Sequence, residues 1–454
     1  MMKFRSWFQA KEISSPFPLP KGLYRFPEIE AEYQLSLHLR VEQEQNSSLV
    51  VNGNTILQLN PTATWMTYLI LNQERPNAAI RQLSRLFATS KSNLERDYRA
   101  LVDTLHSILT RRHLCFLENP EVETLFPFAV KPSAPYRMDI ALTYHCNNHC
   151  FHCYNEPNRN PSLLSLEQWK TTLDRIWELG IPHVVFTGGE PTLVESLVPL
   201  IEYAKLEGLV VGLNTNGRRL CDFGYAQSLH SAGLDHIQIT LESADPTIHD
   251  RIVQRNGAWK QTIAGIQNAL NTQCFVMTNT TLLRENLATL PQTLKLLSDL
   301  GVSTIGLNAL IYSGRGSSVA YPLTEGELVP LLKFAQDFVE QSGQRLIWYT
   351  PTHYCHFDPM SLNLGVKGCT AALYNMCIEP NGDVLPCQSY YQSLGNILTD
   401  KWESIWRHPL AEGLRNRTYV SEQCDGCLIV SQCGGGCPLA PTQTAWQTLL
   451  RMES

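Results

Sequence analysis

Strand-like and helix-like segments alternate along this chain from about residue 136 to residue 350. Six apolar runs, each followed by a helical segment or loop, are MDIALTYH, HVVFTGG, LVVGLNTNG, HIQITLES, CFVMTNTTL and STIGLNAL. Such alternation predicts parallel strands joined by right-handed crossovers. Six units, where a closed barrel has eight, favour an α/β partial (β/α)6 TIM-like barrel over residues 136–350. Its ligand site should lie at the carboxyl ends of the strands.

The flanking segments have different patterns. Residues 1–40 are rich in proline, and we expect a lead-in segment there with no more than one strand. Residues 41–125 contain Asn52-Gly53, which suits the positive φ angles of a type I′ hairpin turn, and then three helical segments. This order describes a small winged-helix domain. In residues 351–454 Cys, Gly and Pro dominate, which indicates a segment held together by metal rather than by a large apolar core.

Composition and charge exclude several classes of protein. The 454 residues carry 36 Lys and Arg against 42 Asp and Glu, so the net charge of −6 gives no reason to expect nucleic acid or an anionic membrane as partner. The first residues lack the apolar core of a signal peptide, and no run of about 18 uncharged apolar residues occurs. We therefore expect a soluble, cytoplasmic protein.

The 14 cysteines are distributed unevenly. In a large chain without a signal peptide the thiols should stay reduced. Three lie between Cys146 and Cys153 and eight between Cys355 and Cys437, which is typical of metal ligands. The remaining three are expected to be ordinary buried thiols: Cys115, Cys221 and Cys274.

The first cysteine cluster follows directly on the first barrel strand. Cys146, Cys150 and Cys153 have the spacing C-x3-C-x2-C, and three thiolates on one loop can hold three corners of a [4Fe–4S] cluster, leaving one iron open. Zinc with a neighbouring His is the alternative. It is disfavoured because zinc sites usually pair C-x2-C units from two separated hairpins.

Together with Gly188-Gly189-Glu190-Pro191 after the second strand, this loop resembles the radical S-adenosylmethionine (SAM) superfamily. The resemblance implies a [4Fe–4S] cluster on the three cysteines and SAM bound at its open iron. Electron transfer to SAM would then give a 5′-deoxyadenosyl radical that removes a hydrogen atom from the substrate, while the protein positions the reactants. The positions carried over to SAM are His152, Gly188, Gly189, Glu190, Asn214, Ser243 and Arg255. For the last three, a capping or loop role is the alternative.

The C-terminal cysteines resemble the SPASM extension of peptide-modifying radical enzymes, which holds auxiliary Fe–S clusters. The resemblance implies a first auxiliary cluster on Cys369, Cys387 and Cys437, with Cys377 as fourth ligand. A second would use Cys424, Cys427 and Cys433. The family pattern continues with one more Cys, and PLAPTQTAWQTLLRMES contains none, so we expect one or two auxiliary clusters. The second would have a non-Cys ligand, use Cys355, keep an open iron or be absent, and zinc on these cysteines is the alternative.

The N-terminal hairpin and helices resemble the precursor-recognition domain of enzymes that modify ribosomally made peptides. Such a domain would bind a leader peptide as a strand added along the edge of the hairpin. A DNA-binding winged helix is the rival interpretation. It is disfavoured because the basic residues of the third helix, Lys91, Arg96 and Arg99, are interleaved with Glu95 and Asp97.

The resulting hypothesis is a radical SAM, SPASM-containing oxidoreductase that matures a ribosomally synthesised precursor peptide. We expect crosslink formation before epimerisation or backbone excision, and an electron donor such as a flavodoxin or ferredoxin. No catalytic acid or base can be named from the sequence. One alternative is a sulfatase-type formylglycine maturase, disfavoured because Gln388 stands where that subfamily has Asp. The other is a zinc-stabilised DNA-binding regulator.

Overall fold

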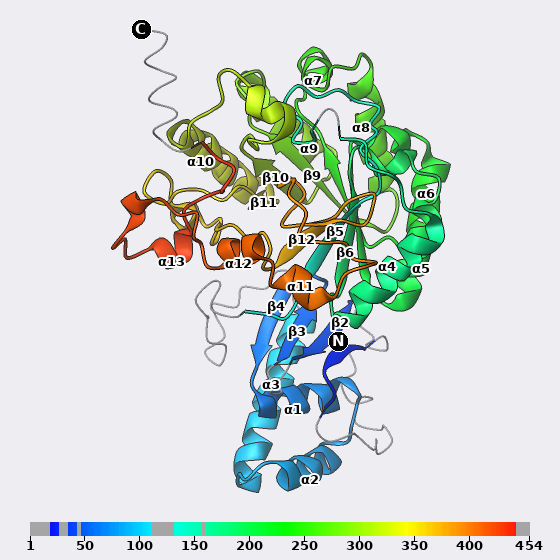
Figure 1. Cartoon of the computed structure of the whole chain (residues 1–454), viewed down its shortest axis with the longest axis vertical. Helices are drawn as coiled ribbons and strands as arrows, with labels where there is room; N and C mark the ends of the chain where they lie inside the picture. The colour runs from blue at the N-terminus through cyan, green and yellow to red at the C-terminus, as the bar shows by residue number, and fades with distance from the viewer. Residues whose placement is uncertain (1–18, 27–34, 43–46, 111–130, 157–158, 442–454) are drawn as a thin grey trace. The chain divides into compact units, whose positions relative to one another are not determined.

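The computed structural model describes residues 19–26, 35–42, 47–110, 131–156 and 159–441 (Figure 1). The chain divides into two compact units. The first comprises residues 1–136 with 175–182, and the second comprises residues 137–174 with 183–454. Within the described residues, no helix combines the length and apolar character needed to cross a membrane.

The first unit contains a four-stranded antiparallel sheet in the order β1-β2-β3-β4. The predicted turn between β3 and β4 is confirmed, because Asn52 and Gly53 have φ angles of 51° and 70°. The three predicted helices follow, and the side chain of Asn60 caps the first by accepting from Ala63 N at 2.8 Å. The strands are β1 (Gly22–Arg25), β2 (Leu37–Val41), β3 (Ser47–Val51) and β4 (Thr55–Leu59), and the helices are α1 (Pro61–Leu71), α2 (Pro76–Leu86) and α3 (Lys91–Thr110).

The sheet of this unit is larger than the sequence indicated. β1 and most of β2 fall in the segment where no more than one strand was expected. β1 is only four residues long, so it gives no period-2 pattern. β2 and β3 are buried along their whole length, so they show no alternation of buried and exposed residues either. The core of the unit joins these strands to the helices through fully buried leucines, among them Leu39, Leu49, Leu69, Leu83 and Leu94.

The second unit is built on a nine-stranded sheet in the order β11-β10-β9-β8-β7-β6-β5-β12-β13. β5 to β11 are parallel, which confirms the partial α/β barrel. The strands are β5 (Arg137–Ala141), β6 (His183–Thr187), β7 (Val210–Thr215), β8 (His236–Thr240), β9 (Phe275–Thr281), β10 (Thr304–Asn308), β11 (Arg345–Trp348), β12 (Asn375–Ile378) and β13 (Val384–Leu385).

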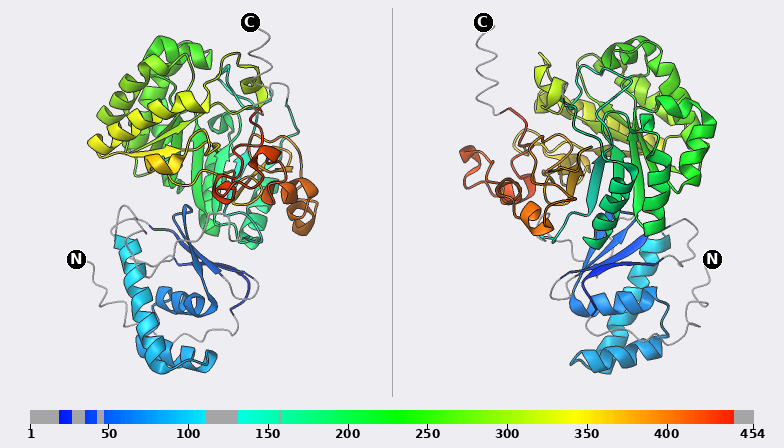
Figure 2. Two further views of the ribbon diagram at one scale, coloured as in Figure 1. Left: turned by 90° about the vertical axis from the view of Figure 1, so that its left-hand side faces the viewer. Right: turned by 45° about the vertical axis from the view of Figure 1, so that its right-hand side comes forward.

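Helices α5 to α9 cover one face of this sheet (Figures 1 and 2). The helices of the barrel are α4 (Leu166–Glu178), α5 (Leu197–Glu207), α6 (Phe223–Ser231), α7 (Pro246–Val253), α8 (Ala258–Leu270), α9 (Leu290–Asp299) and α10 (Glu325–Ser342). Three short helices follow in the C-terminal segment: α11 (Trp402–Trp406), α12 (Pro409–Arg415) and α13 (Val430–Cys433).

Three strands of the large sheet were not predicted. β11 is a four-residue strand that follows the long helix α10, and β12 and β13 lie in the Cys-rich segment. β12 pairs in parallel with β5, with Cys377 opposite Asp139. The C-terminal segment is therefore anchored in the sheet by main-chain hydrogen bonds as well as by any metal it holds.

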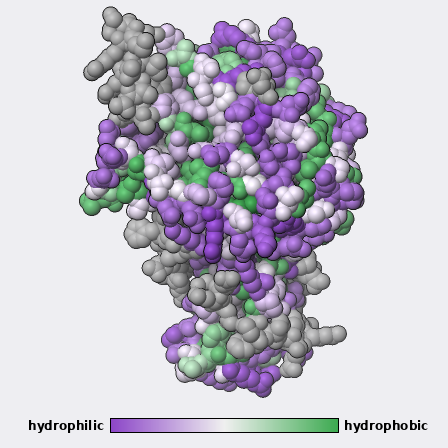
Figure 3. Space-filling view, in the orientation of Figure 1, coloured by the Kyte–Doolittle hydropathy of each residue, from purple (hydrophilic) through white to green (hydrophobic). Residues whose placement is uncertain are grey.

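The loop before α13 exposes apolar side chains to solvent. Leu428 is 97% exposed and Ile429 is 41% exposed. Hydrophobic surface is visible in Figure 3 where Figure 1 places this part of the chain.

Candidate metal centre

The three predicted cluster ligands lie on one loop that follows β5. The backbone N–H groups of His149 and Phe151 donate to Val253 O and Ile252 O at 2.9 and 3.2 Å, which ties the loop to the end of α7. Gly316 N donates to Cys153 O at 3.1 Å. The loop is thus held from two other connections at the carboxyl ends of the strands.

The sulfur atom of Cys146 receives N–H groups from the chain itself. Asn148 N lies 3.4 Å and Asn216 Nδ2 3.9 Å from Cys146 Sγ. Hydrogen bonds of this kind are among the factors that tune cysteine-ligated Fe–S clusters.

Burial raises the pKa of these thiols, to about 11 for Cys146 and well above the ordinary value for Cys150. Each thiol also feels its neighbours, since the charge of Cys153 contributes to both shifts. Burying several thiolates together is unfavourable unless a cation compensates, and a coordinating metal deprotonates a thiol outright. The donor set therefore fits a metal cluster.

The Gly188-Gly189-Glu190 loop after β6 packs directly on the segment that leads into Cys146. Gly189 N donates to Thr143 O at 2.6 Å and Glu190 N to His145 O at 2.9 Å. A Cβ atom on Gly188 would lie 2.2 Å from Thr143 O, and Gly188 has a φ of +128°. A Cβ atom on Gly189 would lie 2.3 Å from His145 O. The two glycines are required because two stretches of backbone meet here.

Gly189→Ala is expected to push the glycine loop away from the cysteine loop. Because positional errors of about 1 Å can cost on the order of 10²-fold in rate, we expect a comparable fall in SAM cleavage. Chromatography of 5′-deoxyadenosine from the anaerobically reconstituted, reduced protein measures it. Gly326→Ala in α10 is the matched control, since a Cβ atom there meets nothing within 4 Å. Equal rates for the two variants would contradict this role of Gly189.

The Glu190 carboxylate is fully committed to the chain itself. Its Oε1 accepts from Thr192 N, Thr192 Oγ1 and Thr215 Oγ1 at 3.1, 2.6 and 2.7 Å, and its Oε2 accepts from Asn216 N at 2.8 Å. Glu190 is buried. This side chain joins the glycine loop to the end of β7, so contact of the loop with a ligand would come from its backbone.

His152 is turned toward the end of β8. Its Nε2 lies 3.1 Å from Glu242 Oε1, and the other carboxylate oxygen of Glu242 accepts from Thr281 N at 3.0 Å. Glu242 N donates to Nδ1 of buried His249 at 3.2 Å, and burial lowers the pKa of His249. Asp250 accepts from the backbone of Gly257 and Trp259, so both members of the His249-Asp250 pair support loops.

The other positions carried over to SAM are placed unequally. Asn214 lies on β7 beside Gln238 of β8. Ser243 is buried, and its Oγ lies 2.8 Å from Thr289 Oγ1 and accepts from Asp245 N at 3.0 Å. Arg255 is exposed on the turn after α7. The structure brings Asn214 near the strand ends, whereas Ser243 takes part in loop bonding.

Arg218 contacts the cysteine loop and was not singled out from the sequence. Its Nη1 donates to Asn147 O at 2.6 Å and to Asn148 Oδ1 at 2.9 Å. The charge of Arg255 lowers the pKa of Arg218, second to burial, so the two guanidinium groups lie near each other. Arg218 follows Asn216-Gly217 in sequence. The sequence signal that could have identified it is this group of polar residues just after a strand.

The C-terminal cysteines form a second set. Burial raises the pKa of the Cys369 thiol, and the neighbouring charges of Cys437 and Cys387 raise it further. Burial likewise raises the pKa of Cys387 to about 12, with a contribution from Cys437. These three predicted ligands therefore lie together. Cys377 is buried opposite Asp139 of β5, and after burial the charges of Asp139 and Cys387 contribute to its raised pKa.

The isolated cysteines differ from the expectation in one case. Cys274 is buried as predicted, but Cys221 is exposed, because it lies at the end of a single turn before α6. Cys115 lies outside the described residues.

A polar cluster joins the two cysteine-bearing segments, and sequence reasoning missed most of it. Glu379, which follows β12, accepts from Tyr144 Oη at 2.7 Å and is ion-paired with Arg159. The Arg159 guanidinium lies 4.7 Å from the ring centre of Tyr391. Tyr391 Oη donates to Asn155 Oδ1 at 2.8 Å, and Asn155 Nδ2 donates to Gly188 O at 2.9 Å.

Comparison with known proteins agrees with this geometry. The sequence matches the radical SAM superfamily over residues 140–297 and the SPASM iron-sulfur cluster-binding domain over residues 369–428. These ranges begin within β5 and at Cys369.

Two relatives and one solved structure illustrate the similarity. The AdoMet-dependent heme synthase of Oleidesulfovibrio alaskensis is 26% identical over 312 residues, which cover 65% of this chain and 80% of that protein. Mycofactocin maturase MftC of Mycobacterium tuberculosis is 29% identical over 323 residues, which cover 68% of this chain and 79% of MftC. The crystal structure of Streptococcus suis SuiB bound to precursor peptide SuiA superposes with a TM-score of 0.65 at 15% identity, covering 92% of this chain and 96% of SuiB.

The fold, the three-cysteine loop and these matches define the class of protein: the chain is an enzyme with a radical SAM domain over residues 140–297. Within this class, the C-terminal segment identifies the chain as an enzyme that also carries a SPASM domain. The cofactors are accordingly a [4Fe–4S] cluster, SAM and auxiliary Fe–S clusters. These matches favour an enzyme over the alternative of a zinc-stabilised DNA-binding regulator.

Proposed function

We propose that this enzyme is a maturase that modifies a ribosomally synthesised precursor peptide. The observation that carries the proposal is the combination, in one chain, of a radical SAM barrel, a SPASM domain and an N-terminal antiparallel sheet with three helices. The similarity to MftC, named a maturase, and the fold shared with SuiB, crystallised with a precursor peptide, support it.

The site residues take the following parts in the proposal. Cys146, Cys150 and Cys153 would hold the [4Fe–4S] cluster, and SAM bound there would supply the radical chemistry for abstraction of a hydrogen atom from the peptide. The glycine loop fixes the cysteine loop through main-chain hydrogen bonds. His152 with Glu242, and Arg218 with the backbone of Asn147, hold the cysteine loop against the ends of β7 and β8. Fixed geometry of this kind is the contribution that a protein makes to cofactor chemistry.

The C-terminal segment is proposed to carry electrons. Cys369, Cys387 and Cys437, with Cys377 as fourth ligand, hold the first auxiliary cluster, and Cys424, Cys427 and Cys433 belong to the second. A flavodoxin or ferredoxin is the proposed electron donor, because each turnover of SAM consumes one electron.

The N-terminal unit is proposed to bind the leader of the precursor. Within the described residues β1 and β4 are the outer strands of its sheet, and both are less buried than β2 and β3. An extended leader peptide adds naturally to such an edge, where main-chain hydrogen bonds give affinity. Holding the leader raises the effective concentration of the core peptide at the barrel.

We propose that the reaction is crosslink formation, with epimerisation or backbone excision as the other outcomes. Co-expression with a short peptide encoded beside the gene, followed by mass spectrometry in light and heavy water, tests this. A crosslink removes two hydrogens, an epimerisation introduces deuterium from heavy water, and excision removes backbone atoms. Crosslinked peptide supports the proposal.

Other products would contradict it. SAM cleavage that depends on a tetrapyrrole rather than a peptide would favour an activity like that named for the heme synthase relative. An aldehyde formed on a sulfatase peptide would favour the formylglycine alternative.

A further inference from the structure

The loop after β11 carries a cysteine that the first auxiliary set does not use. Cys355 lies in this loop, about 70 residues before Cys424 in sequence. Cys355 and Cys427 are exposed, Cys424 is half-buried and Cys433 is buried. The contacts of the loop decide whether Cys355 belongs with the other three thiols.

The backbone on the N-terminal side of Cys355 wraps around Cys433. Tyr354 N donates to Cys433 Sγ at 3.4 Å, and Cys433 Sγ lies 3.6 Å from Thr352 O. The residue next to Cys355 is therefore in direct contact with the sulfur of a proposed ligand. An N–H···S contact is what a cluster-ligating sulfur receives in Fe–S proteins.

The glycines after Cys433 leave room for this loop. Gly434, Gly435 and Gly436 have φ angles of 70°, 75° and 73°, in the left-handed region. A Cβ atom on Gly436 would lie 2.7 Å from the His353 ring, so a larger residue there would displace the loop. The CGGGC segment and the loop at Cys355 are thus packed together.

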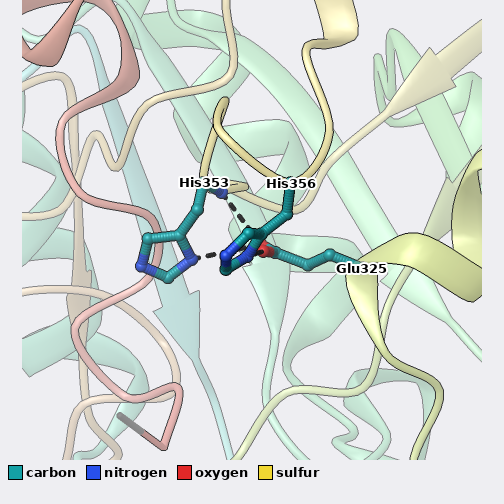
Figure 4. Close-up of side chains that lie close together, drawn as sticks. All are labelled: Glu325, His353 and His356. Carbon is teal, nitrogen blue, oxygen red and sulfur yellow. Dashed lines mark hydrogen bonds and ion pairs between the residues drawn. The ribbon is translucent and has the colours of Figure 1, made fainter. Parts of the chain in front are cut away.

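A carboxylate clamps the two histidines that flank Cys355 (Figure 4). Glu325, the first residue of α10, accepts from His353 N at 2.8 Å, and its two oxygens lie 3.3 Å from His353 Nδ1 and 2.7 Å from His356 Nδ1. The donor atoms of the three side chains lie within 4.8 Å of one another. His356 N and Phe357 N both donate to His353 O at 2.9 Å, which closes a tight turn around Cys355. Both flanks of Cys355 are therefore held, the N-terminal one against Cys433 and the C-terminal one through His356 against Glu325.

Cys355 also lies within electrostatic reach of Cys433 and Cys424, and Cys424 within reach of Cys433 and Cys427. Burial raises the pKa of the Cys355 thiol, and the charges of Cys433 and Cys424 add to the increase. Burial likewise raises the pKa of Cys424, with contributions from Cys433 and Cys427.

We infer that Cys355 is the fourth protein ligand of the second auxiliary Fe–S cluster, together with Cys424, Cys427 and Cys433. Glu325 acts through the two histidines as a positioning residue for the loop that carries Cys355. The inference rests on the proposed function only for the presence of a cluster in the SPASM domain, and it is independent of the peptide reaction.

Alkylation of the wild-type full chain tests the ligand directly. The apoprotein and the anaerobically reconstituted protein are treated with iodoacetamide, and each cysteine is scored by peptide mass spectrometry. Cys355 is expected to be alkylated at least about 10-fold more slowly in the reconstituted protein, since ligation removes the free thiolate. Exposed Cys221 is the internal control and should react equally in both forms. Protection of Cys427 without protection of Cys355 would overturn the inference.

Cluster lability gives a second, independent readout. Cys355→Ala is expected to lose absorbance near 400 nm to a chelator at least about 10-fold faster than Cys221→Ala, because one ligand is missing. Glu325→Gln should shift the rate in the same direction by less, with Glu340→Gln on the same helix as its control. Loss of iron at the rate of Cys221→Ala, or zinc in place of iron at these cysteines, would overturn the inference.

Failure of the proposed function would give a different result from failure of the inference about Cys355. Absence of peptide modification by the wild-type protein would count against the maturase, while protection of Cys355 would still establish its ligand role.

Discussion

Cys150→Ala is expected to abolish formation of 5′-deoxyadenosine. Cys150 lies between the two backbone contacts that fix the cysteine loop, from His149 and Phe151 to the end of α7. Its thiol pKa is raised well above the ordinary value by burial and by Cys153. Without this ligand the cluster keeps only two thiolates, so turnover should fall to the level of the enzyme-free reaction.

The measurement is chromatography of 5′-deoxyadenosine after anaerobic reconstitution and reduction, with iron analysis of the same samples. Iron should fall by about one four-iron cluster, while the auxiliary clusters remain. Cys221→Ala, which removes an exposed cysteine, should behave as wild type. Turnover by Cys150→Ala above background would refute the assignment of Cys146, Cys150 and Cys153 as the ligands.

Glu190→Ala should cause the largest loss of local stability among changes near the site. Removing the carboxylate leaves two backbone N–H groups and two threonine hydroxyls without their acceptor in a buried setting. Loss of such a buried, hydrogen-bonded charge costs about 4 kcal/mol. Glu190→Gln retains one acceptor oxygen, but its amide NH2 group would face another donor. This variant should lose about 2 kcal/mol of local stability.

Amide hydrogen exchange over residues 190–193 and 213–218 measures this effect locally, which suits a chain of two units. Exchange there should be roughly 10³-fold faster in Glu190→Ala, since 1.4 kcal/mol corresponds to a factor of ten. Exchange in the N-terminal sheet should not change. Glu340→Ala, at an exposed position of α10, is the control, and equal exchange in the two variants would show that Glu190 is not the link between these loops.

The sequence predicted those parts of the fold that have a local signature. The six barrel strands are five to seven residues long and largely buried, so each leaves a recognisable apolar run. β1 and β11, with four residues each, are too short to show a period. β12 was missed because its partner β5 lies more than 200 residues earlier in the chain.

The candidate site shows the same division. The cysteines and the glycine loop are contiguous motifs, whereas Arg159 and Glu379 are 220 residues apart and meet only in the folded chain. Ser243 and Arg255 were carried over by resemblance of position; in the fold Ser243 forms hydrogen bonds with Thr289 and Asp245, and Arg255 is exposed on the turn after α7. Arg218 contacts the cysteine loop, which lies 70 residues earlier in the sequence, and a sequence pattern does not predict a contact at that separation.

The pairing of β12 with β5 has a consequence for how the enzyme is made. β5 leads into the cysteine loop, and one of its edges is completed by residues 375–378. During synthesis this edge stays open until residues 375–378 have left the ribosome, and open edges favour wrong pairing. Cluster insertion at Cys146, Cys150 and Cys153 should therefore follow synthesis of β12, so that the barrel site becomes competent only in a chain that already carries its SPASM domain.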